Sequence, residues 1–522
     1  MNRRFAGLAI GIALALLGAP AASAAEEPSL TRAQAEAELR DVTQAFSTPE
    51  RGIDPTVELR DLALAVPALE GAERRQARAI LSRPPSGGEP PFGGNWPSSA
   101  DEMTAETDDF IVHWPEIEGC AVTPPGRPDR DCDEPSLNDA APANDIPDYV
   151  DAVIAAVDDS IAVENGELGW PLPKSDSGQP DNGGNGKLDV YISDLCDESD
   201  FKPCVFGYAN PADRSATCKG SPFKCAAYLV LDNDYSEFGR SGGLLGMRVT
   251  TAHEYNHILQ FNLDTNQDTW MFESTAVWAE EQVFPADDDW VRSYMDDWAR
   301  RSTVPLTKPD FRKIYGSTVW NHWLERGDGN YGANIILDAW ELSRDVEPKD
   351  YAVGAYDAAI EQNGGEGFSD EFASFAAATS EWRTGDGNFP DAQELTDVER
   401  QGKLAAGKGQ KVIELDNTSY RLIDVNPKDA DRVKLKVRAN GKVSWGIALV
   451  GRNGTMRGGT VERNDASFAG SGKGKVTLDD AQDYERITAV VVNADGRVAG
   501  PKANFREFDY TKNNKEFKVK VR

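Results

Sequence analysis

The sequence predicts an α+β protein that ends in an all-β sandwich. Two observations support this fold class. Between about residues 104 and 390, short apolar runs typical of strands are mixed with apolar residues at helical spacing. After about residue 405 the apolar period becomes two, and turn signals such as Asn440-Gly441 recur. A chain of 522 residues has room for several such domains.

Residues 1–24 have the pattern of a secretory signal peptide. Two arginines precede an apolar run from Leu8 to Leu17, and Ala22-Ser23-Ala24 is typical of a cleavage site. The run is too short to span a bilayer, and no later stretch is long and apolar enough to be a membrane helix. We therefore expect a secreted, extracellular protein without a membrane span, which begins near Ala25.

Residues 25–103 are predicted to be helical and then irregular. Ala35, Leu39 and Val42 recur at helical spacing, and residues 84–91, rich in Pro and Gly, are expected to form a linker. A helical segment between a signal peptide and a larger domain is often a pro-segment, removed on maturation. It can equally be a structural cap on the next domain, and the sequence leaves both interpretations open.

Residues 104–390 are expected to form the mixed α/β domain. Strands are expected at Asp109–Trp114, Leu188–Ile192 and Ala227–Leu231, and helices at Asp145–Val163 and Leu244–Phe261. Helical patterns rich in tryptophan continue to about residue 385. We expect these tryptophans in the core, with carbohydrate binding as the alternative.

Residues 405–522 are predicted to form a β-sandwich of about seven strands. A Gly-rich, charged bridge at about residues 384–410 precedes it. Val433, Leu435 and Val437 alternate with basic residues, and the alternation returns at the end of the chain. The sequence therefore places the all-β part after the mixed part.

The acidic composition argues against nucleic acid and anionic membranes as partners. The chain has 87 acidic and 55 basic residues, and its formal net charge is −32. Such a field repels phosphate groups. It can attract Ca²⁺, but acidity alone does not define a calcium site.

Six cysteines indicate three disulfides in an oxidising environment. Pairing of sequence neighbours is expected, because each such pair closes a short loop. The expected pairs are Cys120 with Cys132, Cys196 with Cys204, and Cys218 with Cys225. A thiolate metal site is the alternative, but no CxxC spacing supports it.

His253-Glu254-Tyr255-Asn256-His257 is the most informative motif. It uses two of the four histidines in the chain. Spacing of i and i+4 places both imidazoles on one helix face, where they can bind a single metal ion. Glu254 projects about 100° around the helix, where it can take a proton from a metal-bound water. Two surface histidines on an amphipathic helix are the alternative.

Two histidines do not complete a catalytic metal site, which needs a third protein ligand. Glu273 is the best candidate, because a turn after the first helix would bring a second helix alongside it. Ala276 is small and would let the two helices approach closely. Other acidic residues nearby remain open as ligands: Asp264, Asp268, Glu280 and Glu281. Glu280 lies on the same helix face as Glu273 and could instead support a metal ligand.

These two segments resemble the gluzincins, the zinc metallopeptidases with HExxH and a downstream Glu. The resemblance is closest to a group of secreted bacterial metallopeptidases with a HEYxHxxQF helix and a WxxExxAxW helix, and it covers residues 104–390. It implies a zincin-like domain with zinc ligands His253, His257 and Glu273 and with Glu254 as general base. It also implies that the last strand before the motif lies at the sheet edge, where an extended peptide can add.

The chain departs from the thermolysin pattern in two places. Val277 stands where those enzymes have an Asp that supports a zinc-bound His, so this support must come from elsewhere. The gap between His257 and Glu273 is also shorter. The aminopeptidase signature is absent, which favours an endopeptidase over an exopeptidase.

Further site residues are less specific in the sequence. Tyr315 and His322 could stabilise an oxyanion, as could His113, but each could also be a packed core residue. Residues 181–192 partly match a Ca²⁺ loop, but Gly183 and Ile192 stand at two ligand positions. A tight Asn/Gly turn is the alternative.

The sequence as a whole predicts a secreted zinc endopeptidase that acts on protein or peptide substrates. The zinc ion would activate a water, and Glu254 would move its proton to the leaving amine. A catalytically silent binding or adhesion protein on the same fold is the competing hypothesis. The intact Glu254 argues against it, because a silent site does not need the base.

Overall fold

A computed structural model shows an α+β protein with an all-β C-terminal region, as the sequence predicts. The segments 1–24 and 120–132, with the expected signal peptide and Cys120–Cys132 pair, lie outside the described residues. The structure describes residues 30–45, 51–86, 90–91, 93–117, 139, 143–179, 181–196, 204–211, 218, 224–236, 238, 242–346, 351–384, 388–455, 458–497 and 514–522.

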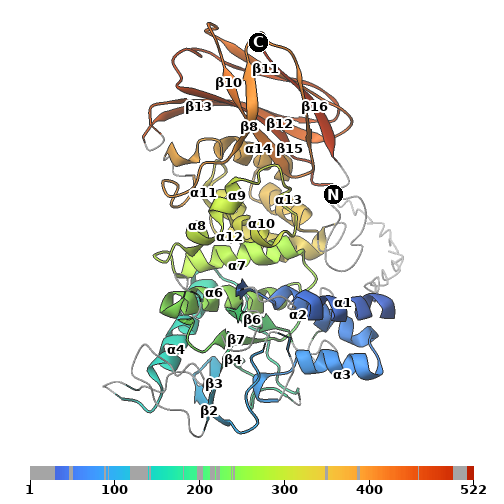
Figure 1. Cartoon of the computed structure of the whole chain (residues 1–522), viewed down its shortest axis with the longest axis vertical. Coiled ribbons are helices and arrows are strands. Elements are labelled where there is room, and N and C mark those ends of the chain that lie inside the picture. The colour runs from blue at the N-terminus through green and yellow to red at the C-terminus, as the bar shows by residue number, and fades with distance from the viewer. Residues whose placement is uncertain are drawn as a thin grey trace, which may run out of the picture.

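A five-stranded mixed sheet lies at one end of the molecule (Figure 1). β3, β4 and β7 are parallel, and β2 and β6 are antiparallel edge strands. The sequence predicts β3, β4 and β7 but not β6, which is short and only weakly apolar. The expectation that β7 forms the sheet edge is therefore wrong. In spatial order the strands are β2 (Asp101–Glu106), β3 (Phe110–Glu116), β4 (Leu188–Ser193), β7 (Tyr228–Asp232) and β6 (Gly207–Asn210).

The two faces of this sheet are covered by different parts of the chain. Side chains alternate along a strand, so neighbours face opposite sides. Val190 and Leu229 belong to the large core that includes α4 (Asp148–Ser160) and α6 (Gly243–Phe261). Tyr191, Tyr228 and Val230 face the other way, into a core shared with the N-terminal helices. The expected helices at 145–163 and 244–261 are confirmed as α4, which continues into a π-helix (Ile161–Glu167), and α6.

The N-terminal segment, residues 30–86, packs on this second face (Figure 1). Its strand β1 pairs in parallel with β5. The stretch expected as a linker begins with Pro84, which is buried. Its elements are α1 (Arg32–Ala45), β1 (Arg51–Ile53), α2 (Thr56–Ala65), a 3-10 turn (Val66–Ala68), α3 (Gly71–Ile80) and a second 3-10 turn (Pro84–Ser86); β5 is Cys204–Val205.

Helices fill the middle of the molecule, between the mixed sheet and the sandwich (Figure 1). The tryptophans of this region are core residues, as expected: Trp278, Trp290, Trp298, Trp320, Trp323, Trp340 and Trp382 are all buried. The helices are α7 (Thr269–Val283), α8 (Asp289–Ser293), α9 (Met295–Ala299), α10 (Phe311–Gly316), α11 (Thr318–Arg326), α12 (Asn334–Leu342), α13 (Ala352–Gln362) and α14 (Phe368–Ala378), with 3-10 turns at Ser343–Asp345 and Trp382–Thr384.

The C-terminal region is a sandwich of two antiparallel-rich sheets with nine described strands, more than the seven expected. It begins at Arg400, inside the sequence expected to be a bridge. Val433, Leu435 and Val437 point into its core. The five-stranded sheet has the order β13-β12-β15-β10-β8 and the other β14-β11-β16-β9, with β8 (Arg400–Ala405), β9 (Lys411–Leu415), β10 (Ser419–Asn426), β11 (Val433–Ala439), β12 (Ser444–Asn453), β13 (Thr460–Ala469), β14 (Gly472–Leu478), β15 (Arg486–Asn493) and β16 (Lys515–Val521).

The sandwich and the helices share one core. Tyr420 of β10 packs against Phe372 of α14, and its hydroxyl accepts a hydrogen bond from Thr379 Oγ1 at 2.8 Å. Leu422 and Val490 of the same sheet also join the helical core. The outer face of the five-stranded sheet is therefore an internal surface.

Two of the three expected disulfides are present, Cys196–Cys204 and Cys218–Cys225. Both join sequence neighbours, which confirms the expected pairing for these four residues. Across the described residues, every helix is too short or too polar to cross a membrane.

His322 on α11 should make the stability of the fold depend on pH. Its ring is fully buried against Trp290, and burial lowers its pKa from 6.5 to about 3. Between these values the unfolded chain binds the extra proton, so acidification through this range favours unfolding. The group therefore adds stability above about pH 6.5 and loses it as pH falls toward 3.

We predict that His322→Asn flattens this part of the pH profile. The free energy of unfolding of the wild type should fall more steeply than that of the variant, by about 1.4 kcal/mol per pH unit. Urea titrations of both proteins between pH 4 and 7 measure the difference in slope. Equal slopes would show that His322 takes up its proton in the folded state.

Candidate metal centre

Four potential metal ligands converge between α6, α7 and the N-terminal segment. They are His253 and His257 of α6, Glu273 of α7, and Asp54, two residues before α2. Their ligand atoms all lie within 4.8 Å of one another. The sequence predicts the first three and does not predict Asp54.

The distances between these atoms suit a tetrahedral ion. Ligands at 2.0–2.1 Å from such an ion lie roughly 3.3–3.4 Å from one another. His253 Nε2 lies 3.5 Å from Glu273 Oε2 and 3.1 Å from Asp54 Oδ2. His257 Nε2 lies 3.9 Å and 3.7 Å from the same two oxygens.

Two of these atoms also lack any other role. His257 Nε2 and Glu273 Oε2 are buried, and no described residue forms a hydrogen bond with either. A buried polar atom without a partner is costly, and a metal ion would satisfy both at once. The residues therefore fit a metal ion held by imidazole nitrogens and carboxylate oxygens.

A hydrogen bond at Nδ1, the ring nitrogen away from the cluster, orients each imidazole. His253 Nδ1 bonds to Glu280 Oε1 at 2.6 Å, and His257 Nδ1 bonds to Gln260 Oε1 at 2.7 Å. With the proton on Nδ1 each ring donates to its partner, and the Nε2 lone pair is left for the ion. Glu280 thus gives the support that Val277 cannot give, and Gln260 gives the same support to the other ring.

Glu254 is held beside the ligands by the N-terminal segment. It is buried, and its Oε2 accepts a hydrogen bond from Thr56 Oγ1 at 2.8 Å. Thr56 Oγ1 itself accepts from the backbone N–H of Ala209, on edge strand β6, at 2.9 Å. Burial and the charges of Asp54 and Glu273 raise the pKa of Glu254 well above 4.5, although His253 and Thr56 oppose this.

The site concentrates negative charge. Burial raises the pKa of Glu280 to about 7, against the hydrogen bond with His253. Burial also opposes a charged Asp54, but its interactions with the nearby rings of His253 and His257 prevail and hold its pKa well below the usual range. A divalent cation at the centre would compensate these carboxylates.

The other acidic residues near the motif point elsewhere. Asp264 accepts a hydrogen bond from Ser343 Oγ at 3.1 Å, and Asp268 accepts one from the backbone N–H of Ala352 at 3.1 Å. Glu281 belongs to a separate acidic group with Asp288 and Asp391. None of the three joins the four-residue cluster.

Of the three expected oxyanion donors, Tyr315 lies at the site. Its ring centre is 6.0 Å from that of His253, and burial with the charges of Glu273 and Asp54 raises its pKa well above 10. His322 packs against Trp290 instead. His113 binds Glu102 and Asp189 in the mixed sheet.

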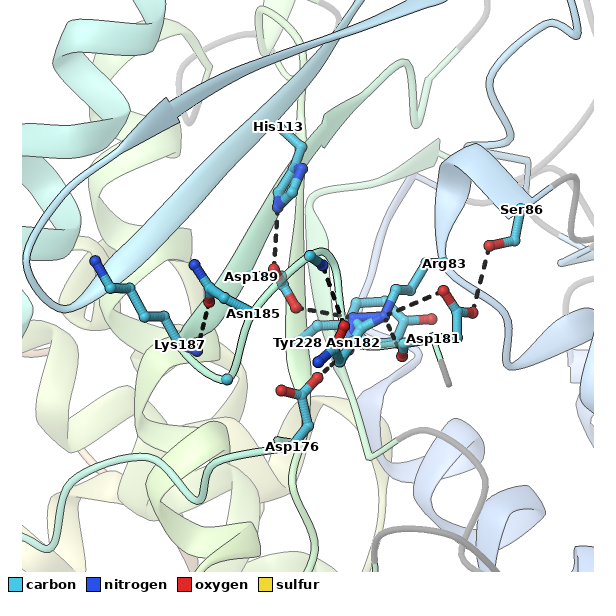
Figure 2. A network of polar contacts seen from close by, with 12 residues as sticks. Arg83, Ser86, His113, Asp176, Asp181, Asn182, Asn185, Lys187, Asp189 and Tyr228 are labelled. Carbon is cyan, nitrogen blue, oxygen red and sulfur yellow. Dashed lines mark hydrogen bonds and ion pairs between the residues drawn. The ribbon is translucent and has the colours of Figure 1, made fainter. Parts of the chain in front are cut away.

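In the loop that partly matches a Ca²⁺ site, residues 181–192, the polar side chains bond to other groups of the protein (Figure 2). Arg83 donates to Asp189 Oδ2 at 3.0 Å and to Asp176 Oδ2 at 2.5 Å, and His113 Nε2 lies 3.0 Å from Asp189 Oδ1. Asn182 and Asn185 accept hydrogen bonds from backbone N–H groups two residues later. The guanidinium of Arg83 thus takes the position at these carboxylates that a cation would need, which favours the turn interpretation.

Asp54, Thr56 and Gln260 are the site residues that the sequence did not predict. Gln260 follows His257 by three residues, so helical spacing alone could have suggested it. Asp54 and Thr56 lie 199 and 198 positions from their partners in the motif. No local pattern links residues so far apart.

Comparison with known proteins adds no family to this geometry. No protein-family model matches the chain, and no curated protein sequence matches it.

We predict that Glu273→Gln weakens metal binding by more than about tenfold, because it removes the charge of a ligand. Metal content after dialysis, measured by atomic emission, tests this. Glu325→Gln is the matched control, since it changes another buried glutamate that belongs to neither group of possible ligands. Equal metal retention by the two variants would exclude Glu273 as a ligand.

Glu280→Gln should lower metal affinity by about 10- to 100-fold without removing a ligand. The amide cannot supply the negative charge that favours the Nδ1 proton of His253. Competition with a chromogenic chelator gives the affinity, and Glu325→Gln again serves as the control. An unchanged affinity would mean that the bond to Glu280 does not tune the ligand.

Proposed function

We propose that the chain is a secreted zinc-dependent endopeptidase whose catalytic part, residues 104–390, is zincin-like. The observation that carries this proposal is the convergence of His253, His257 and Glu273 with Glu254 beside them. Two imidazoles and a carboxylate are a common protein ligand set of catalytic zinc. Zinc would leave a further position for water or substrate.

Each residue then has a role in peptide hydrolysis. A bound zinc ion supplies Lewis acidity, which polarises the scissile carbonyl and acidifies a water. His253, His257 and Glu273 hold the ion, while Glu280 and Gln260 fix the two rings. Glu254 would take the proton of the attacking water and pass it to the leaving amine. Tyr315, whose ring lies beside that of His253, would stabilise the oxyanion.

A protein or peptide substrate suits this architecture. The antiparallel edge strand β6 lies next to the site, since Ala209 reaches Glu254 through Thr56. An extended peptide can add to such an edge through backbone hydrogen bonds. The net charge of −32 argues against nucleic acid, and two disulfides together with the pattern at residues 1–24 support export to an oxidising environment.

Asp54 favours a second candidate, a catalytically silent binding protein. With Asp54 the cluster offers four protein ligands, and a closed set of four is typical of structural zinc. Against this, a structural site does not need a buried carboxylate at Glu254. We therefore place the peptidase first.

Glu254→Gln decides between the two candidates. The amide keeps the size of the side chain and cannot accept a proton, so peptidase activity should fall by about 10²- to 10⁴-fold. Zinc content and Tm should stay near wild type, because no ligand changes. Turnover of a mixed peptide library and zinc content are measured on one sample, with and without chelator. Both are measured in the full chain and again with Asp54→Ala added, because Asp54 as a fourth ligand would close the site. Wild-type turnover by the zinc-loaded variant would contradict the mechanism.

A further inference from the structure

The N-terminal segment reaches the two groups that peptide hydrolysis would use. We propose that this segment is an intramolecular inhibitor, in which Asp54 takes the open metal position and Thr56 holds the general base. The inference rests on the proposed function, because it concerns the regulation of the same site. It would mean that the protein folds in a latent form.

Asp54 lies where an incoming ligand would bind. Its Oδ2 is 3.1 Å from His253 Nε2 and 3.7 Å from His257 Nε2, so it faces both ring nitrogens that point into the cluster. A carboxylate bound there would exclude water and a substrate carbonyl from the same position. Because the segment presents a side-chain carboxylate, it offers no peptide carbonyl for attack at that point.

Thr56 blocks the second group. Its hydroxyl donates to Glu254, and its oxygen accepts from Ala209 N–H on β6. The same short stretch therefore occupies one oxygen of the base and a backbone donor at the sheet edge. β1 extends this contact, because it pairs with β5 directly before β6. A peptide that added to this edge would compete with the segment.

Two buried arginines bind the segment to the rest of the protein. Arg60 is fully buried and donates to Gln267 O at 3.0 Å and to Thr269 Oγ1 at 3.3 Å, where α7 begins. Arg83 binds Asp176 and Asp189, next to the mixed sheet (Figure 2). A charge-assisted hydrogen bond is about twice as strong as a neutral one. Asp54 and Thr56 are thus held in place by contacts outside the site.

A permanent structural ligand is the alternative role for Asp54. That role would explain the metal contacts but not the bond between Thr56 and Glu254. Asp54 faces the ligand nitrogens and Thr56, two residues later, binds the base. An inhibitor is expected to block both groups in this way. The two roles differ in what remains when Asp54 is removed, since an inhibitor is dispensable for the metal.

The test uses the chain from Ala25 onward, loaded with zinc, and acetohydroxamate as a small ligand for an open zinc position. Isothermal titration gives its affinity for the wild type, Asp54→Ala, the more conservative Asp54→Asn, and the control Asp41→Ala, which changes an exposed residue of α1. Metal content is measured on each sample. If Asp54 covers the position, acetohydroxamate can bind only the molecules in which the position is open. The apparent affinity is then the intrinsic affinity multiplied by the fraction of open molecules.

We expect both Asp54 variants to keep zinc and to bind acetohydroxamate at least about tenfold more tightly than wild type and the Asp41 control. Equal binding by all four proteins would overturn the inference. Loss of zinc from both Asp54 variants would also overturn it, because Asp54 would then be a permanent ligand.

A peptidase assay on the same samples separates this inference from the proposed function. Tighter hydroxamate binding without peptide cleavage would uphold the blocking role and sink the peptidase. The opposite outcome is cleavage by the wild-type chain that depends on Glu254, together with Asp54 variants that bind hydroxamate no more tightly than wild type. It would uphold the peptidase and sink the blocking role.

Discussion

The packing of α6 against α7 is the constraint on which the site depends. α7 places Glu273 at the metal side of His253 and Glu280 behind the same ring, about two helical turns apart. Ala276, fully buried between them, lets the helices approach. One helix therefore sets both the position and the tautomer of the first histidine. A shift of α7 along α6 would disturb both together.

This arrangement buries several carboxyl groups close together, which is energetically unfavourable. Asp54, Glu254, Glu273 and Glu280 share a small volume with two imidazoles, and burial raises the pKa of two of these carboxyls. A bound cation is then part of the folding free energy as well as of the chemistry. The ligand cluster also joins the N-terminal segment to the helical core, so the metal would couple these two parts.

Sequence reasoning succeeded where structure is local and failed where it is not. His253, Glu254 and His257 share one helix, and the next helix holds Glu273, so spacing was enough to predict that they meet. Strand β7 was readable as an apolar run, whereas β6 (Gly207–Asn210) is four residues long and has only weak apolar character. In the sandwich, β13 has mostly exposed side chains, so its sequence carries little apolar alternation. Asp54 depends on the tertiary path of the whole segment.

The shared core beneath the N-terminal helices has a consequence for how the segment could leave. Tyr191, Tyr228 and Val230 are buried by helices on the other side of the sheet, together with Leu62 and Ile80. Cutting the chain after residue 86 would not expose this face, because every one of these contacts survives the cut. The cut would turn an intramolecular contact into a bimolecular binding equilibrium. The segment would no longer have the high effective concentration that the covalent link provides. The cut segment would then dissociate only when the protein is diluted. A cut molecule in a crowded compartment would keep the segment bound, whereas the same molecule diluted outside the cell would lose it.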